Sequence, residues 1–364
     1  MSQNTFHQFI KFSTDAYGLE RTLRFLQSLT QLMLSYPTLP LTLLPFLGFP
    51  PSHLPKSLSP SKKHTLSELK SRLSLGRRYF RSFRFLENFS QAFDKYIEAS
   101  ASASAKASSS VKSSTSAKNK AKAGGLAVGL ILGGIGLEKW LEILSKGFNG
   151  VYYCAETSTF IDELKVDGLG VWGRDLAKRV MKEENRMWFF SLVLGVLAGC
   201  WKVGRLGGEI AQARREVRLL EKEVRRENKA GGVVRGQQGG WEGKPMRQGE
   251  GGQLQQQQQQ WREEEMRLER VRAGEVKLEE MRTRLDKLVD TRYKAARRAV
   301  ADLLDLAVPG KAVGWVPLST GVVSALMLGS TWLTGLEVWE KCGESVAKSA
   351  AKGEAEAKAK PKSE

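Results

Sequence analysis

The sequence predicts an all-α membrane protein with N-terminal amphipathic helices, one or two transmembrane helices and disordered low-complexity insertions. Apolar residues recur at helical spacing, two uncharged runs approach or reach spanning length, and no segment alternates as a strand would. The 364 residues include 57 basic and 39 acidic side chains, for a formal charge of +18. This balance suits a polyanionic partner, either nucleic acid or an anionic lipid surface.

The N-terminal region, residues 1–98, is expected to consist of amphipathic helices. Between Phe6 and Tyr36, apolar residues step by three and four and form one seam along a helix. A second apolar row begins at Leu23, so the end of this helix must be buried in a bundle or pressed into lipid. The proline-rich residues 37–60 cannot continue the helix, and they either pack over a hydrophobic core or touch the membrane surface.

The predicted helix over residues 66–97 is the candidate functional element. Cations on one side and aromatic rings on the other suit the plane of a lipid interface, where rings sink among acyl chains and cations meet phosphates. The residues predicted to bind the membrane are Lys70, Arg77, Arg78, Phe80, Arg81, Phe83, Arg84, Leu86 and Phe93. The alternative is that the phenylalanines pack against the first helix while the arginines form a solvated face.

The expected partner of this helix is an anionic lipid membrane. Rings inserted into one leaflet expand it relative to the other, which favours curvature; this step is a hypothesis. Nucleic acid is not expected as a partner, because no DNA- or RNA-binding module is visible and phenylalanine at core spacing is not a base-stacking platform.

The rest of the chain divides by composition. Glycines at four-residue spacing would allow close helix packing in lipid, although glycine is also common in plain linkers. These glycines are Gly125, Gly129 and Gly133. The predicted regions after residue 98 are a disordered basic linker (99–123), a middle helical region (124–208), a charged helical loop (209–306) with a disordered Gly/Gln-rich part (230–260), a C-terminal membrane span (307–340) and a polar tail (341–364).

The C-terminal span is predicted from an uncharged run of 24 residues, Val313–Leu336. A helix needs roughly 20 residues to cross a ~30 Å hydrocarbon layer. Trp315 and Trp332 lie 17 residues apart, about 26 Å along a single helix, which would place a tryptophan near each interface.

The first predicted span, residues 187–208, rests on a shorter run. Met187–Trp201 is free of charge, and it reaches spanning length if Lys202 and Arg205 extend toward the headgroups. The alternative is a buried core helix or a re-entrant segment. If both runs span, the two termini share one side of the membrane and residues 202–305 lie on the other; similar basic loads on the two sides give no orientation.

Catalytic, cofactor and metal sites are not expected, so an enzyme is not predicted. The three cysteines are far apart with no histidine nearby, which argues against a disulfide framework and a zinc site. No nucleotide-binding, hydrolase, metalloprotease or EF-hand motif occurs.

Several segments together resemble one family. Residues 9–27 (FIKFSTDAYGLERTLRFLQ) and 76–87 (GRRYFRSFRFLE) resemble the N-terminal segment and the basic amphipathic helix of the peroxisomal biogenesis factor 11 family. Further similar segments, in order, are EKWLEILSKGFNG (138–150), VWG (171–173), VADLLDLAVPG (300–310) and TWLTGLEVWE (331–340). The resemblance covers most of the chain but skips the two low-complexity insertions and the tail.

The resemblance implies a protein of the peroxisomal membrane that promotes curvature, elongation and division of the organelle. It further implies self-association, contact with a dynamin-type GTPase and its adaptor, and termini that face the cytosol. The functional element it carries over is the basic helix, through the cations and aromatic residues named above. Two alternatives stay open: a pore-forming channel for small metabolites in the peroxisomal membrane, and a passive tether. Neither predicted span has a central charge or polar stripe to line a pore.

Overall fold

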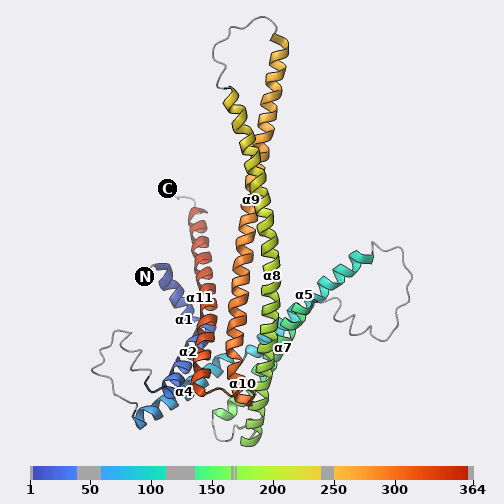
Figure 1. Cartoon of the computed structure of the whole chain (residues 1–364). Helices are drawn as coiled ribbons and strands as arrows, with labels where there is room; N and C mark the ends of the chain where they lie inside the picture. Colours follow the sequence, from blue (N-terminus) through green and yellow to red (C-terminus); the bar gives the residue numbers. More distant parts are fainter. Residues whose placement is uncertain are drawn as a thin grey trace, which may run out of the picture. The chain divides into compact units, whose positions relative to one another are not determined.

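The computed structural model describes residues 3–38, 59–111, 136–164, 168, 170–238 and 250–359, and within these ranges the regular structure is entirely α-helical (Figure 1). The chain forms two compact units. Unit 1 comprises Met1–Trp201 with Ala296–Glu364, and unit 2 comprises Lys202–Ala295. The helices are α1 (Gln3–Thr14), α2 (Ala16–Ser35), α4 (Pro60–Arg81), α5 (Arg84–Val111), α7 (Leu137–Glu163), α8 (Arg174–Gln238), α9 (Glu250–Asp305), α10 (Ala307–Val313) and α11 (Thr320–Ala359).

The first predicted helix is divided in two at Asp15. The Asp15 carboxylate accepts hydrogen bonds from the backbone N–H groups of Tyr17 (3.0 Å) and Gly18 (3.1 Å), which caps the N-terminus of α2. Gly18 lets α1 and α2 approach closely, because a Cβ atom there would lie 1.9 Å from the Phe12 carbonyl oxygen. The apolar seam is therefore shared by two short helices instead of one long helix.

The predicted helix over residues 66–97 is also interrupted, between α4 and α5. The Ser82 N–H group donates to the Tyr79 carbonyl (3.3 Å), and the Ser82 side chain donates to the same oxygen (2.6 Å). Thr157 of α7 donates its hydroxyl proton to the Ser82 carbonyl (2.7 Å). The break thus anchors the α4–α5 junction to α7.

Helix α8 joins two segments that the sequence separates, the apolar run after Arg186 and the charged helix after Gly208. Of the predicted insertion 230–260, residues 230–238 and 250–260 belong to α8 and α9, and 239–249 lie outside the described residues. Residues 99–111 continue α5, and 112–123 lie outside the described residues.

The C-terminal apolar run is not one helix, which corrects the expected start of the span. Helix α10 ends at Gly314, whose φ of +91° is in the left-handed region that favours glycine. The Gly310 carbonyl accepts from the N–H groups of Trp315 (2.9 Å) and Val316 (3.1 Å), and α11 begins only after Pro317. Trp315 therefore lies in the connection, and the predicted 26 Å separation of two tryptophans along one helix does not hold.

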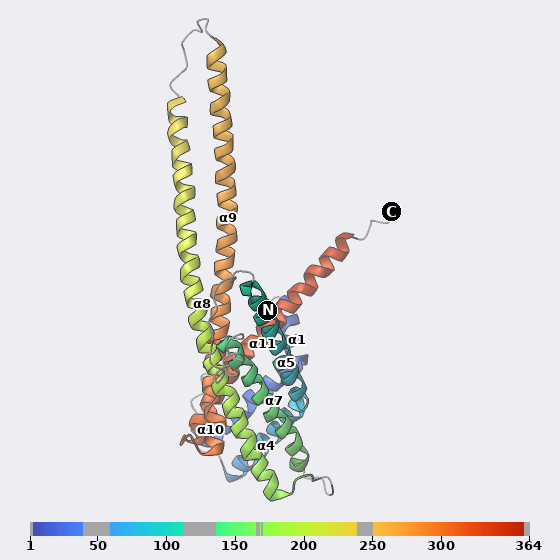
Figure 2. The ribbon, with the colours of Figure 1, turned by 90° about the vertical axis from the view of Figure 1, so that its right-hand side faces the viewer.

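Unit 1 is an antiparallel helical bundle in which α2 packs against α4 and α11, α5 against α7, and α1 against α11 (Figures 1 and 2). Its apolar core is small and centres on Tyr152 and Trp188, whose rings stack at 5.2 Å, with Leu192 beside them. Most of the other buried side chains at the helix contacts are polar or charged.

Unit 2 consists of the second part of α8 and the first part of α9, which run antiparallel (Figure 1). Arg282 donates to Glu221 (2.5 Å), and the Nε of Arg267 donates to the Glu227 carbonyl (3.1 Å). The hydrogen bond to Glu221 raises the pKa of Arg282. The residues of least exposure on each helix recur at spacings of three and four, as in a coiled coil. On α8 they are Leu206, Ile210, Ala213 and Val217, and on α9 they include Val271, Leu278, Met281, Leu285 and Leu288.

Candidate membrane-contacting surface

An exposed row of aromatic and aliphatic side chains follows α4 and α5. Among the predicted membrane-binding residues, the exposed fraction is 37% for Phe80, 76% for Phe83, 59% for Leu86 and 63% for Phe93. Side chains that the prediction missed extend this row, namely Tyr79, Phe89 and Tyr96. We call this set of exposed side chains, from Tyr79 to Ile97, the aromatic row. Phe89 lies against Gly150 and the Tyr96 ring lies 6.3 Å from that of Trp140 on α7, while Phe83 and Phe93 keep most of their apolar area exposed.

The arginines of the same helices do not form an exposed cationic face. Arg77 and Arg81 are only 8% and 5% exposed. Arg81 pairs with Glu156 of α7, and it also donates to the Tyr152 hydroxyl (3.3 Å), which in turn donates to Glu156 (3.1 Å). Arg77 donates to Gln27 of α2 (2.8 Å). These contacts correct the expectation that both guanidinium groups face phosphates or solvent.

Two of the remaining predicted cations, Arg78 and Arg84, also have partners within unit 1. Arg78 pairs with Glu163 (2.9 Å), and the Arg84 guanidinium lies over the Tyr17 ring at 4.1 Å. Lys70 is half-buried; burial lowers the pKa of Lys70, and the nearby Lys311 lowers it further. Both interpretations of the helix are therefore wrong about Arg77 and Arg81, which face the bundle. The outward position of Phe83 and Phe93 agrees with the membrane-interface interpretation and contradicts the alternative, in which the phenylalanines pack against the first helix.

Two buried carboxylates hold the arginines in place. Glu20 of α2 is 2% exposed and lies near three guanidinium groups. Its carboxylate oxygens are 3.5 Å from Arg21, 3.8 Å from Arg77 and 3.6 Å from Arg84. Glu156 of α7 pairs with Arg81 and Arg78 of α4. One sequence signal could have pointed to these two carboxylates, namely an isolated acidic residue within a long apolar helix. Glu20 is the one acid within α2, and Glu156 stands alone between Glu142 and Asp162.

Further polar contacts continue this interior toward the C-terminal helices. Arg24 pairs with Asp305 at 2.6 Å, and Ser330 of α11 donates to the same carboxylate. Both partners of the Arg24–Asp305 pair are buried, so the pair joins α2 to the end of α9 without access to water. Thr159 donates to the buried Glu184 at 3.4 Å. We call these buried groups, with the Glu20 and Glu156 clusters, the polar interior.

Two helices are long and apolar enough to span a membrane. They lie within Asp175–Lys229 on α8 and Thr320–Lys352 on α11. Only 17% of the apolar window on α8 and 39% of that on α11 is buried inside the structure. A core helix of a soluble protein would be mostly buried, so these exposed windows are compatible with transmembrane helices. The predicted packing glycines at 125, 129 and 133 lie outside the described residues.

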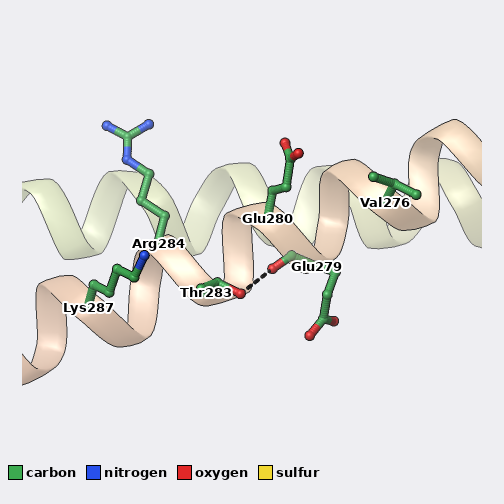
Figure 3. A pocket seen from close by; sticks show the side chains of 6 residues that line it. All are labelled: Val276, Glu279, Glu280, Thr283, Arg284 and Lys287. Atoms are coloured by element: carbon green, nitrogen blue, oxygen red, sulfur yellow. Dashed lines mark hydrogen bonds between the residues drawn. The ribbon is translucent and has the colours of Figure 1, made fainter. Parts of the chain in front are cut away.

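Helix α9 carries a shallow groove on its outer face (Figure 3). Thr283 donates its hydroxyl proton to the Glu279 carbonyl (2.9 Å), and the charged side chains around it are exposed. Its lining residues are Val276, Glu279, Glu280, Thr283, Arg284 and Lys287. Within the described ranges, no cluster of three or more metal-ligating side chains occurs.

A model of the family described as Peroxisomal biogenesis factor 11 (PEX11) matches residues 137–339, more than half of the chain. The chain belongs to the peroxisomal biogenesis factor 11 family. The matched residues run from the start of α7 into α11 and include the candidate span on α8 and the first part of the candidate span on α11. No curated protein and no solved structure matches the chain significantly.

Membership of the peroxisomal biogenesis factor 11 family makes this a peroxisome-associated membrane protein with a role in peroxisome biogenesis and proliferation. The family consists of biogenesis factors and is not a known enzyme family. Helices α1 to α5 precede the matched residues, so the aromatic row lies outside the matched part of the chain.

Proposed function

We propose that this protein promotes curvature, elongation and division of the peroxisomal membrane by inserting the aromatic row of α4 and α5 into lipid. The observation that carries the proposal is the exposure of Phe83 and Phe93 on a protein of a membrane family. Transfer of such a ring from water to an apolar medium contributes about 2 kcal/mol. Four or more rings in one row therefore provide enough energy for insertion, even after discounting their partial burial.

The role proposed for the arginines differs from that of an interfacial cationic face. Because Arg77 and Arg81 are paired with groups of α2 and α7, they fix the orientation of α4 and thereby turn the rings outward. An anionic lipid surface remains the proposed partner, met by exposed cations such as Lys62, Lys63 and Arg72 near the start of α4. Self-association and contact with a dynamin-type GTPase and its adaptor remain proposals that follow from the family.

The test uses the full-length protein reconstituted into vesicles of neutral plus anionic lipid, with tubulation scored by electron microscopy. The variant Phe83→Ser/Phe93→Ser is expected to insert through its other helices but to lose most tubulation. The matched control is Trp261→Ser/Tyr293→Ser, which removes two exposed rings of unit 2. Tubulation that is unchanged in the first variant, or equally reduced in both, would reject the aromatic row as the active element.

The alternative function is a pore for small metabolites. A pore requires polar groups that face water, whereas Arg24 pairs with Asp305 and Arg81 pairs with Glu156 inside the bundle. Conductance across a planar bilayer, measured on the same preparation, separates the two functions. Large conductance together with absent tubulation would favour the pore.

A further inference from the structure

One end of unit 1 collects contacts from α1, α2, α5, α9 and α11. The Phe12 ring lies 5.8 Å from that of Trp339, and Gln8 donates to the Trp339 carbonyl (2.8 Å). Arg297 forms two hydrogen bonds of 2.6 Å with Glu340. At the start of α2, Tyr17 donates to Glu87 of α5. We call this the first end of the bundle.

The opposite end collects the other termini of the same helices. At the start of α11, a Cβ atom on Gly321 would lie 2.3 Å from the Tyr36 ring, so the end of α2 lies against it. Lys311 of α10 donates to Thr320 (2.5 Å). Arg78 of α4 pairs with Glu163 at the end of α7 (2.9 Å). We call this the second end.

Helices α2 and α11 therefore each run from one end to the other, and the segment from Ala296 to Val313 does the same. The start of this segment lies at the first end, because Arg297 pairs with Glu340 of α11. Its last residues lie at the second end, where Lys311 donates to Thr320. Helix α8 follows it in the opposite direction, because a Cβ atom on Gly195 would lie 3.1 Å from Asp302 and one on Gly310 would lie 3.4 Å from Phe189.

Each of these helices, together with α4–α5 and α7, has a stretch without an exposed charged side chain. In α2, α7, α8 and α11 the stretches contain 19 to 26 residues, which corresponds to about 29–39 Å along a helix. These four stretches are therefore long enough to cross the ~30 Å hydrocarbon layer. The other two stretches, in α4–α5 and in Ala296–Val313, contain 14 and 15 residues and are each interrupted by a break between helices. The six stretches are Tyr17–Ser35, Leu73–Leu86, Leu137–Asp162, Glu184–Gly204, Ala299–Val313 and Thr320–Glu340.

The side chains on the outside of these stretches are large and apolar, whereas the polar interior lies within. Exposed examples come from different helices: Phe83, Val151, Leu197, Leu303 and Trp332. The largest fully buried side chains are Glu20, Thr159, Pro309, Ser28, Ser324 and Ser330. A water-soluble bundle buries apolar groups and exposes charges. In a membrane, ionisable groups face the bundle interior and pair with one another, which is the distribution in unit 1.

We propose that lipid acyl chains cover the outer surface of unit 1 all round, so that α2, α4–α5, α7 and Ala296–Val313 cross the membrane beside α8 and α11. Composition alone reveals only α8 and α11, because the other four segments carry charges that point inward. The proposal shares with the proposed function the membrane location that the family supplies. It does not depend on curvature activity.

The crossings determine membrane topology. The chain leaves unit 1 after Trp201 and returns at Ala296, next to Arg297 at the first end. With Ala296–Val313 as an added crossing, residues 202–295, α1 and the part of α11 after Glu340 share one side of the membrane. Two spans alone would separate residues 202–295 from both termini.

The experiment is cysteine labelling of the full chain in sealed, isolated peroxisomes with a membrane-impermeant maleimide. A background without native cysteines (Cys154→Ser, Cys200→Ser, Cys342→Ala) carries single replacements at exposed positions: Arg225→Cys in unit 2, Ser349→Cys on α11 and Lys178→Cys at the start of α8. We expect Arg225→Cys and Ser349→Cys to be labelled from the same side, and Lys178→Cys to be labelled only from the opposite side. Labelling of Arg225→Cys and Ser349→Cys from opposite sides overturns the topology.

Two further measurements protect the test against misfolding and against confusion with the proposed function. In the unmodified chain, the exposed Cys154 of α7 should react only after detergent is added. Phe83→Cys should behave in the same way, and prompt labelling of either thiol in intact organelles overturns lipid coverage. Tubulation that fails while this labelling pattern persists rejects the proposed function and leaves the embedded bundle in place.

Discussion

Unit 1 and unit 2 distribute the same residue types in opposite ways. Unit 1 buries Glu20 and Arg81 and exposes Phe83, whereas unit 2 buries Leu206 and Val217 and leaves its Glu and Arg side chains outside. Each arrangement is stable only in its own surroundings, since charges gain from water and apolar side chains gain from leaving it. This contrast supports our proposal that lipid surrounds unit 1, and it is the distribution expected of a unit 2 that is surrounded by water.

The largest expected effect comes from breaking the polar interior of unit 1. Glu156→Ala removes the carboxylate that pairs with the buried Arg81, whereas Arg78 keeps Glu163 at 2.9 Å, and we expect the loss to cost about 3–5 kcal/mol of folding free energy. Thermal unfolding in detergent measures the loss.

The matched control is Glu221→Ala in unit 2, whose partner Arg282 is half-exposed. An exposed ion pair is screened by water and contributes little to stability, so this variant should unfold near the wild-type temperature. Equal destabilisation by the two substitutions would contradict the expected difference between a buried ion pair in unit 1 and an exposed ion pair in unit 2.

A smaller effect is expected from the apolar contacts of unit 2. Ile210→Ala removes a side chain that is 3% exposed, which should cost about 2–4 kcal/mol and loosen the α8–α9 pair locally. Limited proteolysis of the full chain should then cut faster within residues 202–295 while unit 1 stays intact. Leu219→Ala is the control, because Leu219 is 66% exposed and its truncation should leave the cleavage rate unchanged.

The smallest effect compares two glycines on the helices of unit 2. A Cβ atom on Gly274 would lie 2.9 Å from the Val224 side chain, whereas one on Gly204 meets nothing within 4 Å. Gly204→Ala should therefore stabilise the helix by about 0.5–1 kcal/mol through reduced backbone freedom. Gly274→Ala should not stabilise the helix in this way, because the new Cβ atom would crowd the Val224 side chain. Differential scanning calorimetry would measure how the stability changes of the two variants differ in sign or size. Equal stabilisation by both would show that α8 and α9 are less closely packed there.

Much of the architecture was predictable from local pattern. The all-helical class, the candidate spans on α8 and α11 and the apolar stripe of α9 follow from periodicity and hydropathy, which depend on neighbours a few residues away. The breaks at Asp15 and Gly314 were missed although both carry recognisable capping residues. The apolar run around each break was continuous enough to hide the signal.

The candidate site was predictable only in part. Spacing identified a helix with rings on one side and arginines on another, and it correctly separated Phe83 from Arg81. The same spacing led to the wrong prediction that the arginines lie on the outer surface, because the periodicity of one helix does not show what packs against it. Glu20 and Glu156 lie 57 and 75 residues from Arg77 and Arg81, so their pairing depends on helices brought together by folding.

The sequence by itself determined that this chain is helical, basic, membrane-associated and a member of a peroxisome biogenesis family. Only the tertiary structure decided which side of each helix is inside. The physical reason is that a buried charge requires a partner at close range, and that partner is supplied by a distant helix. Because Glu20 and Glu156 hold Arg77 and Arg81 inside the bundle, the opposite side of the same segment, with Phe83, lies on the outer surface.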